Sequence, residues 1–299
     1  MRWGDMRPSQ NIEDRTGDSG GRMPLGGGLR LGGGALVVVV IVGLLFGVNP
    51  LQILGMMEGG GPVVAPPPQQ APAPRLPTGP KSPGAAANPQ ADFVQRTVGD
   101  TEDTWTALFQ AMGTRYEQPT LVLFSRATYS ACGTASAASG PFYCPADRKV
   151  YLDTDFFREL QGRFGAPGDF AAAYVIAHEI GHHVQNQLGT MQKFDQAAAR
   201  MDPRQRNAAS VRLELQADCY AGVWGHFAAK RNLLEPGDVD EGLRAAAAVG
   251  DDAIQKKTQG RIVPDAFTHG TAAQRARWFR TGLESGDPRS CNTFAAKDL

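Results

Sequence analysis

The stretch Phe170–Leu188, "FAAAYVIAHEIGHHVQNQL", decides both the predicted fold and the predicted site. It is rich in alanine and contains no proline, so it predicts an α-helix. His178 and His182 are four residues apart, which places both imidazoles on one face of that helix, close enough to bind one cation. Residues 171–177 are all apolar, and this indicates a buried helix that would hold the two side chains rigidly.

Glu179 directly follows the first of these histidines. At that position a carboxylate can reach a metal-bound water without itself binding the metal, which is the placement that a general base needs. His183 points about 100° away from His182 on a helical wheel, and we interpret it as a packing or surface histidine. The metal-binding pattern therefore comprises His178, Glu179 and His182.

A third ligand is expected, because a catalytic zinc site has three protein ligands and one open position. The best candidate lies in "RLELQADCYAGVW", where Glu214 and Asp218 are four residues apart on the next predicted helix. Their neighbours are largely apolar, and carboxylates are costly to bury there without a cation. We predict that Glu214 binds zinc and that Asp218 accepts a hydrogen bond from a ligand histidine. Asp218, His226 and Cys219 are the alternative third ligands.

The pattern along the rest of the chain predicts an α+β domain over residues 91–299, with a small antiparallel or mixed sheet and several helices. "TLVLFS" (120–125) and "KVYLD" (149–153) are β-branched or aromatic runs that predict strands joined by a long loop. Helices are expected from about 93 to 113 and at 154–163, 169–188, 203–232, 239–257 and 271–283. The last begins with a predicted capping box, Thr271 with Gln274.

The first ninety residues have a different composition. Residues 1–30 are polar and glycine-rich and are expected to be disordered, residues 31–57 carry no charge and predict a transmembrane helix, and residues 58–90 predict a proline-rich stalk. Arg22 and Arg30 precede the apolar run, whereas the nearest basic residue after it is Arg75. This asymmetry predicts a single-pass protein of the cytoplasmic (inner) membrane, with its N-terminus inside and its folded domain extracytoplasmic.

The four cysteines all follow the apolar run, where an oxidising, periplasmic compartment would permit two disulfides. We favour Cys132 with Cys144 and Cys219 with Cys291, and free buried thiols are the alternative. Thirty basic residues balance thirty acidic residues, so charge does not indicate a nucleic-acid partner. No phosphate-cradling glycine loop supports a nucleotide substrate.

These motifs resemble the bacterial putative neutral zinc metallopeptidases, which are single-pass membrane proteins of the gluzincin type. The similarity is carried by "NIEDRTG", "GPFYCPADRKVYLD", "HEIGHHVQNQLG", "ELQADCYAGVW" and "HGTAAQRARWF". The resemblance implies a zincin-like fold, Zn²⁺ on His178, His182 and Glu214, and Glu179 as general base.

The Glu-x-x-x-Asp pattern is also similar to that of the membrane-bound heat-shock and CAAX-processing peptidases. Those proteins have a histidine followed six positions later by arginine, and His269 and Arg275 have this spacing here, with Gly270 where the relatives have proline. The analogy implies that His269 stabilises the oxyanion of the reaction and that Arg275 holds or orients the site.

The expected function is therefore zinc-dependent hydrolysis of a peptide or protein substrate, with Glu179 acting on zinc-bound water and the chain anchored by one transmembrane helix. By fold-level analogy, a strand such as "KVYLD" would bind extended substrate at a sheet edge. The alternative is a non-catalytic exported module that contains zinc and binds a partner, a pseudo-peptidase. Nothing in the sequence predicts an oligomeric state.

Overall fold

The computed structural model describes residues 1–17, 88–136 and 140–299, which form a mostly helical domain with a small sheet. The helices are α3 (Pro89–Ala111), α4 (Phe156–Gly162), α5 (Asp169–Gln187), α6 (Thr190–Ala198), α7 (Pro203–Lys230), α8 (Asp238–Ala248), α9 (Asp251–Gln259) and α10 (Ala272–Ser285). The strands are β1 (Ile12–Asp14), β2 (Thr120–Phe124), β3 (Ala127–Ser130), β4 (Gly133–Ser136), β5 (Phe142–Cys144) and β6 (Lys149–Asp153). Short 3₁₀ helices lie at η1 (Trp3–Asp5), η3 (Pro264–Ala266) and η4 (Pro288–Cys291).

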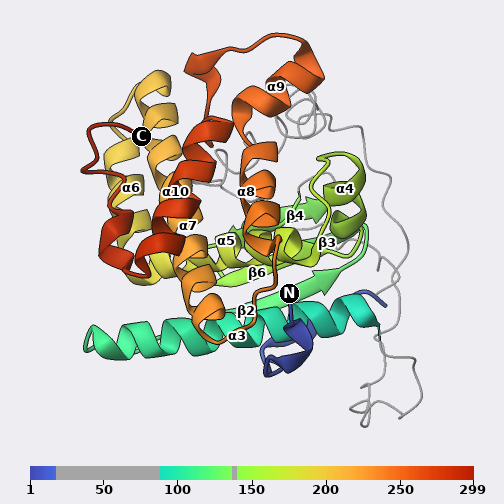
Figure 1. Cartoon of the computed structure of the whole chain (residues 1–299). Helices are drawn as coiled ribbons and strands as arrows, with labels where there is room; N and C mark the ends of the chain where they lie inside the picture. The colour runs from blue at the N-terminus through green and yellow to red at the C-terminus, as the bar shows by residue number, and fades with distance from the viewer. Residues whose placement is uncertain (18–87, 137–139) are drawn as a thin grey trace, which may run out of the picture.

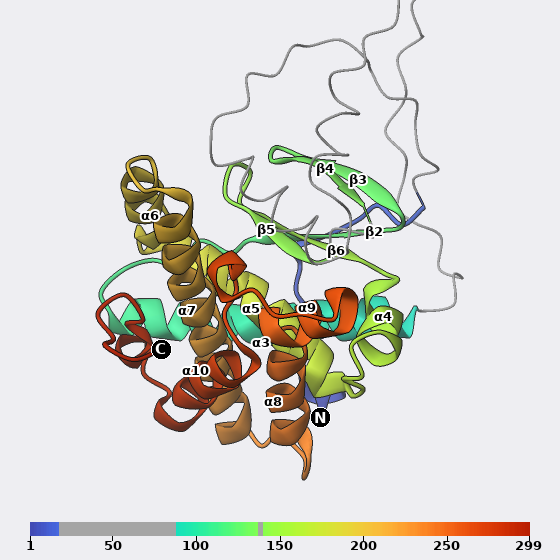
Figure 2. The ribbon, with the colours of Figure 1, turned by 90° about the horizontal axis from the view of Figure 1, so that it is seen from above.

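The main sheet is mixed, with the strand order β1-β2-β6-β5. The first three strands are parallel and β5 pairs antiparallel with β6. Because side chains alternate across a strand, Leu121 and Leu123 of β2 enter the main core. Val122 and Phe124 enter a second, smaller core. The β3–β4 hairpin, which the sequence analysis expected as part of a loop, lies beyond the sheet on the side away from the helices (Figure 2).

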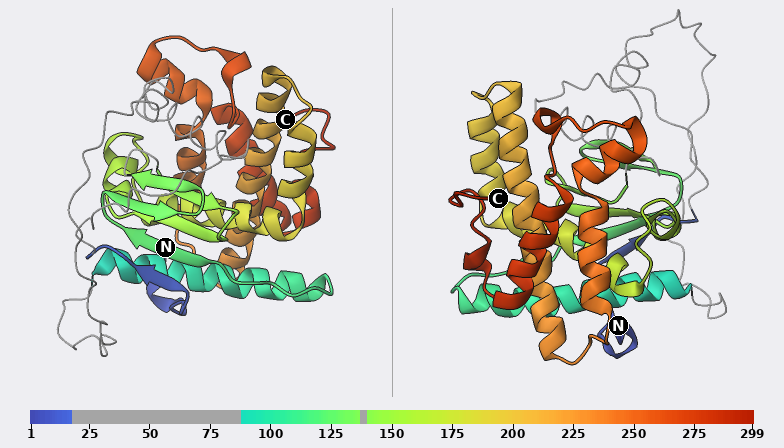
Figure 3. Two further views of the ribbon diagram at one scale, coloured as in Figure 1. Left: turned by 180° about the vertical axis from the view of Figure 1, so that it is seen from behind. Right: turned by 45° about the horizontal axis from the view of Figure 1, so that its top comes forward.

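The helices form a layer beside this sheet, and α5 lies within the helical layer. Helices α7 and α10 lie side by side (Figure 3). Two glycines allow that pairing. A Cβ on Gly222 would lie 2.0 Å from the Phe279 carbonyl oxygen, and one on Gly282 would lie 1.9 Å from the Cys219 carbonyl oxygen. The predicted capping box of α10 is confirmed, since Thr271 and Gln274 bond reciprocally.

The predicted helix over residues 239–257 is wrong, because the chain breaks there into α8 and α9. Gly250 has extended backbone at the break. A Cβ at this position would lie 2.3 Å from the backbone nitrogen of Ala272, so glycine permits the start of α10 to pack against the break. The sequence analysis also missed α6, which follows α5 after the left-handed Gly189.

Residues 1–17 correct the expectation of a disordered N-terminal segment. Strand β1 pairs with β2, so it is one edge of the main sheet. Gly99 of α3 accommodates the segment, since a Cβ there would lie 2.0 Å from the Arg7 carbonyl oxygen. Glu102 receives hydrogen bonds from Ser9 (2.6 Å) and Asn11 (2.7 Å). Figure 1 shows this blue segment packed beside α3.

This packing overturns the predicted membrane topology. That topology placed residues 1–30 on the cytoplasmic side of the membrane and residues 91–299 on the opposite side, but β1 and β2 are hydrogen-bonded neighbours in one sheet. In the described ranges, no helix combines the length and apolar character needed to cross a membrane, and the expected span at 31–57 lies outside these ranges. The transmembrane helix and the inner-membrane location are therefore not supported. The expected stalk also lies outside the described residues, apart from Asn88 to Gln90, where α3 begins.

Both disulfides are formed with the pairing favoured from the sequence. Cys132–Cys144 joins the β3–β4 turn to β5 across 12 residues of chain, and Cys219–Cys291 joins α7 to η4 across 72 residues. The second disulfide fixes the C-terminal tail against the helix that carries Glu214 and Asp218.

Candidate metal centre

Three side chains on two helices converge on one point. The Nε2 atom of His178 lies 3.2 Å from a carboxylate oxygen of Glu214, and the Nε2 atom of His182 lies 3.6 Å from the other oxygen. One donor atom from each residue lies within 4.8 Å of the others. Tetrahedral zinc with bonds of about 2.0–2.1 Å separates its ligand atoms by about 3.4 Å. This set of two nitrogens and one oxygen therefore fits Zn²⁺ in both spacing and chemistry.

The close approach of α5 and α7 makes this convergence possible. Gly181, between the two ligand histidines, faces α7, and a Cβ on it would lie 2.9 Å from the Ala217 carbonyl oxygen. Any larger residue would push the helices apart at the level of the three donors. The glycine in His-Glu-x-x-His thus has a steric role that spacing alone does not reveal.

On one side of the site, Asp218 supports His178. Its Oδ1 atom lies 2.8 Å from Nδ1 of the imidazole and also accepts a 2.6 Å hydrogen bond from the Tyr174 hydroxyl. The guanidinium of Arg275 donates to both carboxylate oxygens, at 2.8 and 2.9 Å. Asp218 and Arg275 thus lie where the sequence analysis expected residues that support the site.

Charge in this network is balanced within a buried space. Burial raises the pKa of Asp218, but Arg275 and His178 outweigh it and lower that pKa to about 2. Burial also opposes ionisation of Glu214, yet His182 and His269 hold its pKa well below the usual range. Burial lowers the pKa of His178, whereas Asp218 and Glu214 raise it, with a net value of about 9. Both carboxylates are therefore charged at neutral pH, as cation binding requires.

On the other side, a neutral residue supports His182. Its Nδ1 atom lies 2.9 Å from Oε1 of Gln185, a fully buried side chain three residues further along α5. The sequence analysis did not single out this glutamine. Its only sequence signal is a helical spacing of three from a predicted ligand, which is too common to be informative.

Glu179 lies on α5 between the two imidazole ligands and is buried, with 7% of its surface exposed. No hydrogen bond to its carboxylate is formed within the described parts of the chain. A carboxylate that no protein group holds can accept a proton from a water molecule, as a general base must.

His269 approaches the same site from the loop before α10. The Glu214 carboxylate raises the pKa of His269 against the effect of burial. The loop packs against α7, since a Cβ on Gly270 would lie 3.3 Å from the side chain of Leu215, the residue after Glu214. Asp251, the first residue of α9, accepts a bond from Nδ1 of His269 at 3.1 Å. It also accepts bonds from the backbone N–H groups of Thr268, His269 and Gly270, at 2.7, 2.7 and 3.0 Å. The sequence analysis missed Asp251, because only the path of the loop brings it to His269.

The other candidate ligands lie elsewhere. Cys219 is in a disulfide, and His226 binds the Leu283 carbonyl oxygen at 2.8 Å. His183 is a buried packing histidine, bonded to Tyr143 at 3.0 Å and to the Glu117 carbonyl oxygen at 2.6 Å. Burial lowers the pKa of His183 to about 4, so its ring is neutral.

A second acidic group, Asp169, Asp238 and Glu241, also has the spacing of a cation site. The α-amino group of Met1 already lies against it, 2.8 Å from Asp169 and 3.3 Å from Asp238. An ammonium thus balances these carboxylates. The cluster joins the beginnings of α5 and α8, so its role is in packing.

The proposal that "KVYLD" pairs with substrate at a sheet edge is wrong. This segment is β6, which pairs with β2 on one side and with β5 on the other. Its backbone hydrogen bonds are therefore used inside the sheet. Strand β5 is the edge strand next to β6, with β1 at the opposite edge of the described sheet. Strand β5 contacts α5 through Tyr143, which bonds to His183 and Asn186.

Comparison with known proteins gives one family. The family described as "Putative neutral zinc metallopeptidase" matches residues 1–294. The chain is 45% identical to an Escherichia coli K12 protein, "Uncharacterized protein YpfJ", over 98% of this chain and 99% of that one. It is 46% identical to "Uncharacterized protein Rv2575" of Mycobacterium tuberculosis H37Rv, over 72% of this chain and 75% of the relative. No solved structure was found to match it.

Proposed function

Since the chain belongs to the putative neutral zinc metallopeptidase family, we propose that it hydrolyses peptide bonds in a zinc-dependent reaction. The convergence of His178, His182 and Glu214 at the spacing of a tetrahedral metal site carries this proposal. No fourth histidine, cysteine, aspartate or glutamate joins the group in the parts of the chain that the structure describes. A structural zinc site usually closes its fourth position with such a residue, so three ligands favour catalysis.

Zinc held by these residues would lower the pKa of a coordinated water and polarise the carbonyl of the bond to be cleaved. The protein groups carry out the proton transfers. Glu179 accepts a proton from the attacking water and returns it to the leaving amine. Its position on α5 supports this role, and so does the absence of a hydrogen-bond partner for its carboxylate among the described residues. Asp218 and Arg275 hold His178 in place throughout.

His269 is the candidate for stabilising the negative charge that develops on the carbonyl oxygen. Its Nδ1 atom bonds to Asp251, and its Nε2 atom has no hydrogen-bond partner within residues 1–17, 88–136 and 140–299. Because Nδ1 carries the proton that is donated to Asp251, the imidazolium form is the one that can donate a hydrogen bond from Nε2 to an oxyanion. The packing of the neighbouring Gly270 against Leu215 of α7 supports this role, because the oxyanion would form beside the metal ligands that α7 and α5 carry.

We propose an extended peptide as the substrate form. Strand β5 is the free edge of the sheet that contacts α5. A peptide that adds to this edge through backbone hydrogen bonds would run past the helix that carries the ligands. This assigns to β5 the role that the sequence analysis gave to β6.

The test compares the full-length wild type with Glu179→Gln. Zinc content is measured by mass spectrometry, and cleavage is measured on a pool of peptides. We expect about one zinc per chain in both proteins. Cleavage should fall by at least about 10²-fold in the variant, because the amide cannot accept the proton. His178→Ala serves as the matched control that should lose both zinc and cleavage.

Two results would contradict the proposal. Cleavage that survives in Glu179→Gln would exclude this glutamate as the base. Bound zinc without cleavage in the wild type would instead favour the non-catalytic module that binds a partner. A His269→Gln variant tests the role of His269 in stabilising the oxyanion. It should keep its zinc, and its kcat should fall roughly 10²–10³-fold.

A further inference from the structure

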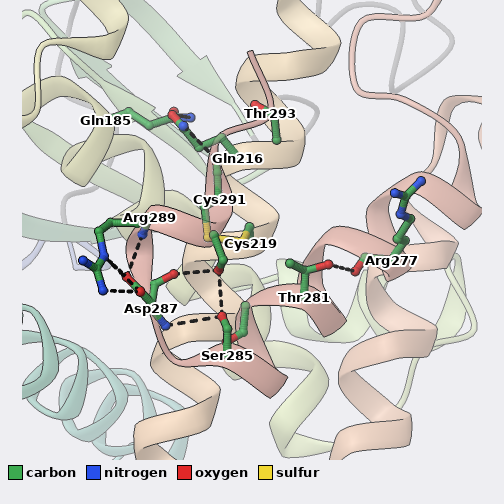
Figure 4. Close-up of a disulfide and its surroundings, with 12 residues drawn as sticks. Gln185, Gln216, Cys219, Arg277, Thr281, Ser285, Asp287, Arg289, Cys291 and Thr293 are labelled. Carbon is green, nitrogen blue, oxygen red and sulfur yellow. Dashed lines mark hydrogen bonds and ion pairs between the residues drawn. A yellow bond between two sulfur atoms is a disulfide. The ribbon is translucent and has the colours of Figure 1, made fainter. Parts of the chain in front are cut away.

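We infer that Gln185 is a positioning residue that fixes the tautomer and the orientation of His182, and that the C-terminal tail supports it through Gln216. The inference rests on the proposed function for the identity of His182 as a zinc ligand. It adds a buried amide chain that runs from that ligand to the Cys219–Cys291 disulfide (Figure 4).

The other hydrogen bonds of Gln185 set the direction of its side-chain amide. Its Nε2 group donates to the Leu213 carbonyl oxygen at 2.7 Å and to Oε1 of Gln216 at 3.2 Å. Both partners are oxygen acceptors. If the amide were turned over, its own oxygen would face two other oxygens, which is unfavourable in a buried space. Gln185 therefore presents its oxygen to His182.

The direction of the Gln185 amide determines which nitrogen of the His182 ring carries the proton. An amide oxygen only accepts hydrogen bonds, so the His182 Nδ1 atom at 2.9 Å must carry the proton. In the neutral ring, which is the form that binds a metal, Nε2 is then the unprotonated nitrogen, and this atom faces Glu214. Metal ligation by histidine depends on this kind of outer hydrogen bond, which sets both the tautomer and the ring plane. The other ligand, His178, has the same arrangement with Asp218.

Gln216 and the C-terminal tail hold the Gln185 side chain in place. Gln216 lies on α7 between Glu214 and Asp218, and its Nε2 group donates to the Cys291 carbonyl oxygen at 2.9 Å. Cys291 is fully buried and is joined to Cys219 of the same helix. Figure 4 shows Gln185, Gln216 and Cys291 in sequence beside the disulfide. The tail thus supplies the last acceptor of a chain that begins at a metal ligand.

The test uses Gln185→Met in the full-length chain. Methionine has a similar length and no hydrogen-bonding amide, so the core remains filled. The probe is Zn²⁺ alone, with the dissociation constant measured by competition with a chelating dye. We expect the dissociation constant to rise roughly 10- to 100-fold in Gln185→Met, and less in Gln216→Met. Gln187→Met, on the same helix but bonded to the Glu117 backbone, should match the wild type.

A second measurement reads the tautomer without any metal. Ring ¹⁵N spectra of the metal-free protein at pH 8 should show His182 protonated on Nδ1 in the wild type and a mixture of tautomers in Gln185→Met. Assignment comes from a His182→Gln variant. If Gln185 had a purely structural role, Gln185→Met would be less stable than the wild type in the metal-free state, but its His182 tautomer would be unchanged.

The outcomes separate this inference from the proposed function. Equal dissociation constants for wild type and Gln185→Met, or an unchanged tautomer, would overturn the inference while zinc binding by the wild type stands. A wild type that binds no zinc would remove the proposed function, and the ring spectra would still decide whether Gln185 fixes the tautomer of His182.

Discussion

The two imidazoles of the metal centre are held in contrasting ways. His178 bonds to a carboxylate that is paired with an arginine, in a space where Asp218 is fully buried and Arg275 is nearly so. His182 bonds to the neutral amide of Gln185, whose other partners are also neutral. The same function of orienting a ring is thus performed once with charge and once without.

The two supports differ in how much stability is lost when one partner is removed. A buried ion pair contributes little net stability when intact, but removal of one partner leaves an uncompensated charge. A neutral amide chain carries a smaller penalty when it is broken. The charged side links α5 and α7 to α10, whereas the neutral side links them to the C-terminal tail. The two supports should therefore fail by different amounts and through different parts of the chain.

The largest effect is expected for Asp218→Asn. The change leaves the Arg275 guanidinium buried without its counter-charge, so the free energy of unfolding of the metal-free protein should fall by about 3–5 kcal/mol. Denaturant unfolding measures this loss.

Asp100→Asn is the matched control, because Asp100 pairs with Arg231 far from the metal ligands, and Arg231 is 35% exposed. Asp100→Asn should lower the free energy of unfolding by less than Asp218→Asn does, and its zinc affinity should equal that of the wild type. Equal losses in the two variants would mean that burial of Arg275 has no special cost.

The second effect tests the tail. Replacing Cys219 and Cys291 by serine opens a closed loop of 72 residues and should lower the free energy of unfolding by about 4 kcal/mol. Replacing Cys132 and Cys144 opens only 12 residues, with an expected loss of about 3 kcal/mol.

Zinc affinity distinguishes the two disulfides more clearly than stability. Only the first pair of substitutions should weaken zinc binding, since only Cys291 receives the hydrogen bond from Gln216. If both pairs weakened binding to the same degree, the tail would have no particular connection to His182.

A smaller effect on stability is expected for Gln185→Met. The substitution leaves Nδ1 of His182 without its acceptor, which costs about 1–3 kcal/mol in the metal-free protein. Thermal unfolding in the presence of a chelator measures this loss of stability, and Asp218→Asn is measured under the same conditions for comparison. A loss as large as that of the aspartate variant would show that charge does not distinguish the two supports.

The smallest effect is expected for Gly181→Ala, which acts on both supports by changing the distance between α5 and α7. Alanine gains about 1 kcal/mol of helix propensity. Its Cβ would meet the Ala217 carbonyl oxygen at 2.9 Å, and such overpacking costs about 1–3 kcal/mol. The net result should be a loss of about 1 kcal/mol, measured by denaturant unfolding. Gly162→Ala, where a Cβ meets open space, should not destabilise the protein.

The sequence predicted those parts of the site that depend on spacing within one helix. His178, Glu179 and His182 lie within two turns of α5, and Glu214 and Asp218 lie within two turns of α7, so helical geometry alone sets their directions. Gln185 was not predicted, because a spacing of three from a ligand is common and the groups that fix its amide, Leu213 and Gln216, lie on α7. Asp251 was not predicted, because its partner His269 belongs to another element. A single glutamine or aspartate has no pattern that indicates what lies opposite it.

The fold was predicted to a similar extent. Long periodic segments such as α5, α7 and α10 were found, and so were the apolar strands β2 and β6. The strand β1 was missed because "IED" is three residues long and has no alternation to recognise. Its partner β2 begins more than a hundred residues later, so the pairing is a tertiary contact that local sequence does not encode.

The N-terminal strand also bears on how the protein should be produced. A polypeptide started at Ala91, the domain boundary suggested by composition, would lack β1 and would expose the unpaired edge of β2, an apolar strand. Such an edge recruits other strands and promotes aggregation. The backbone contact of Arg7 with Gly99 and the hydrogen bond of Ser9 to the buried carboxylate of Glu102 would be lost at the same time. Recombinant work on the metal centre should therefore keep the first seventeen residues together with the helical domain.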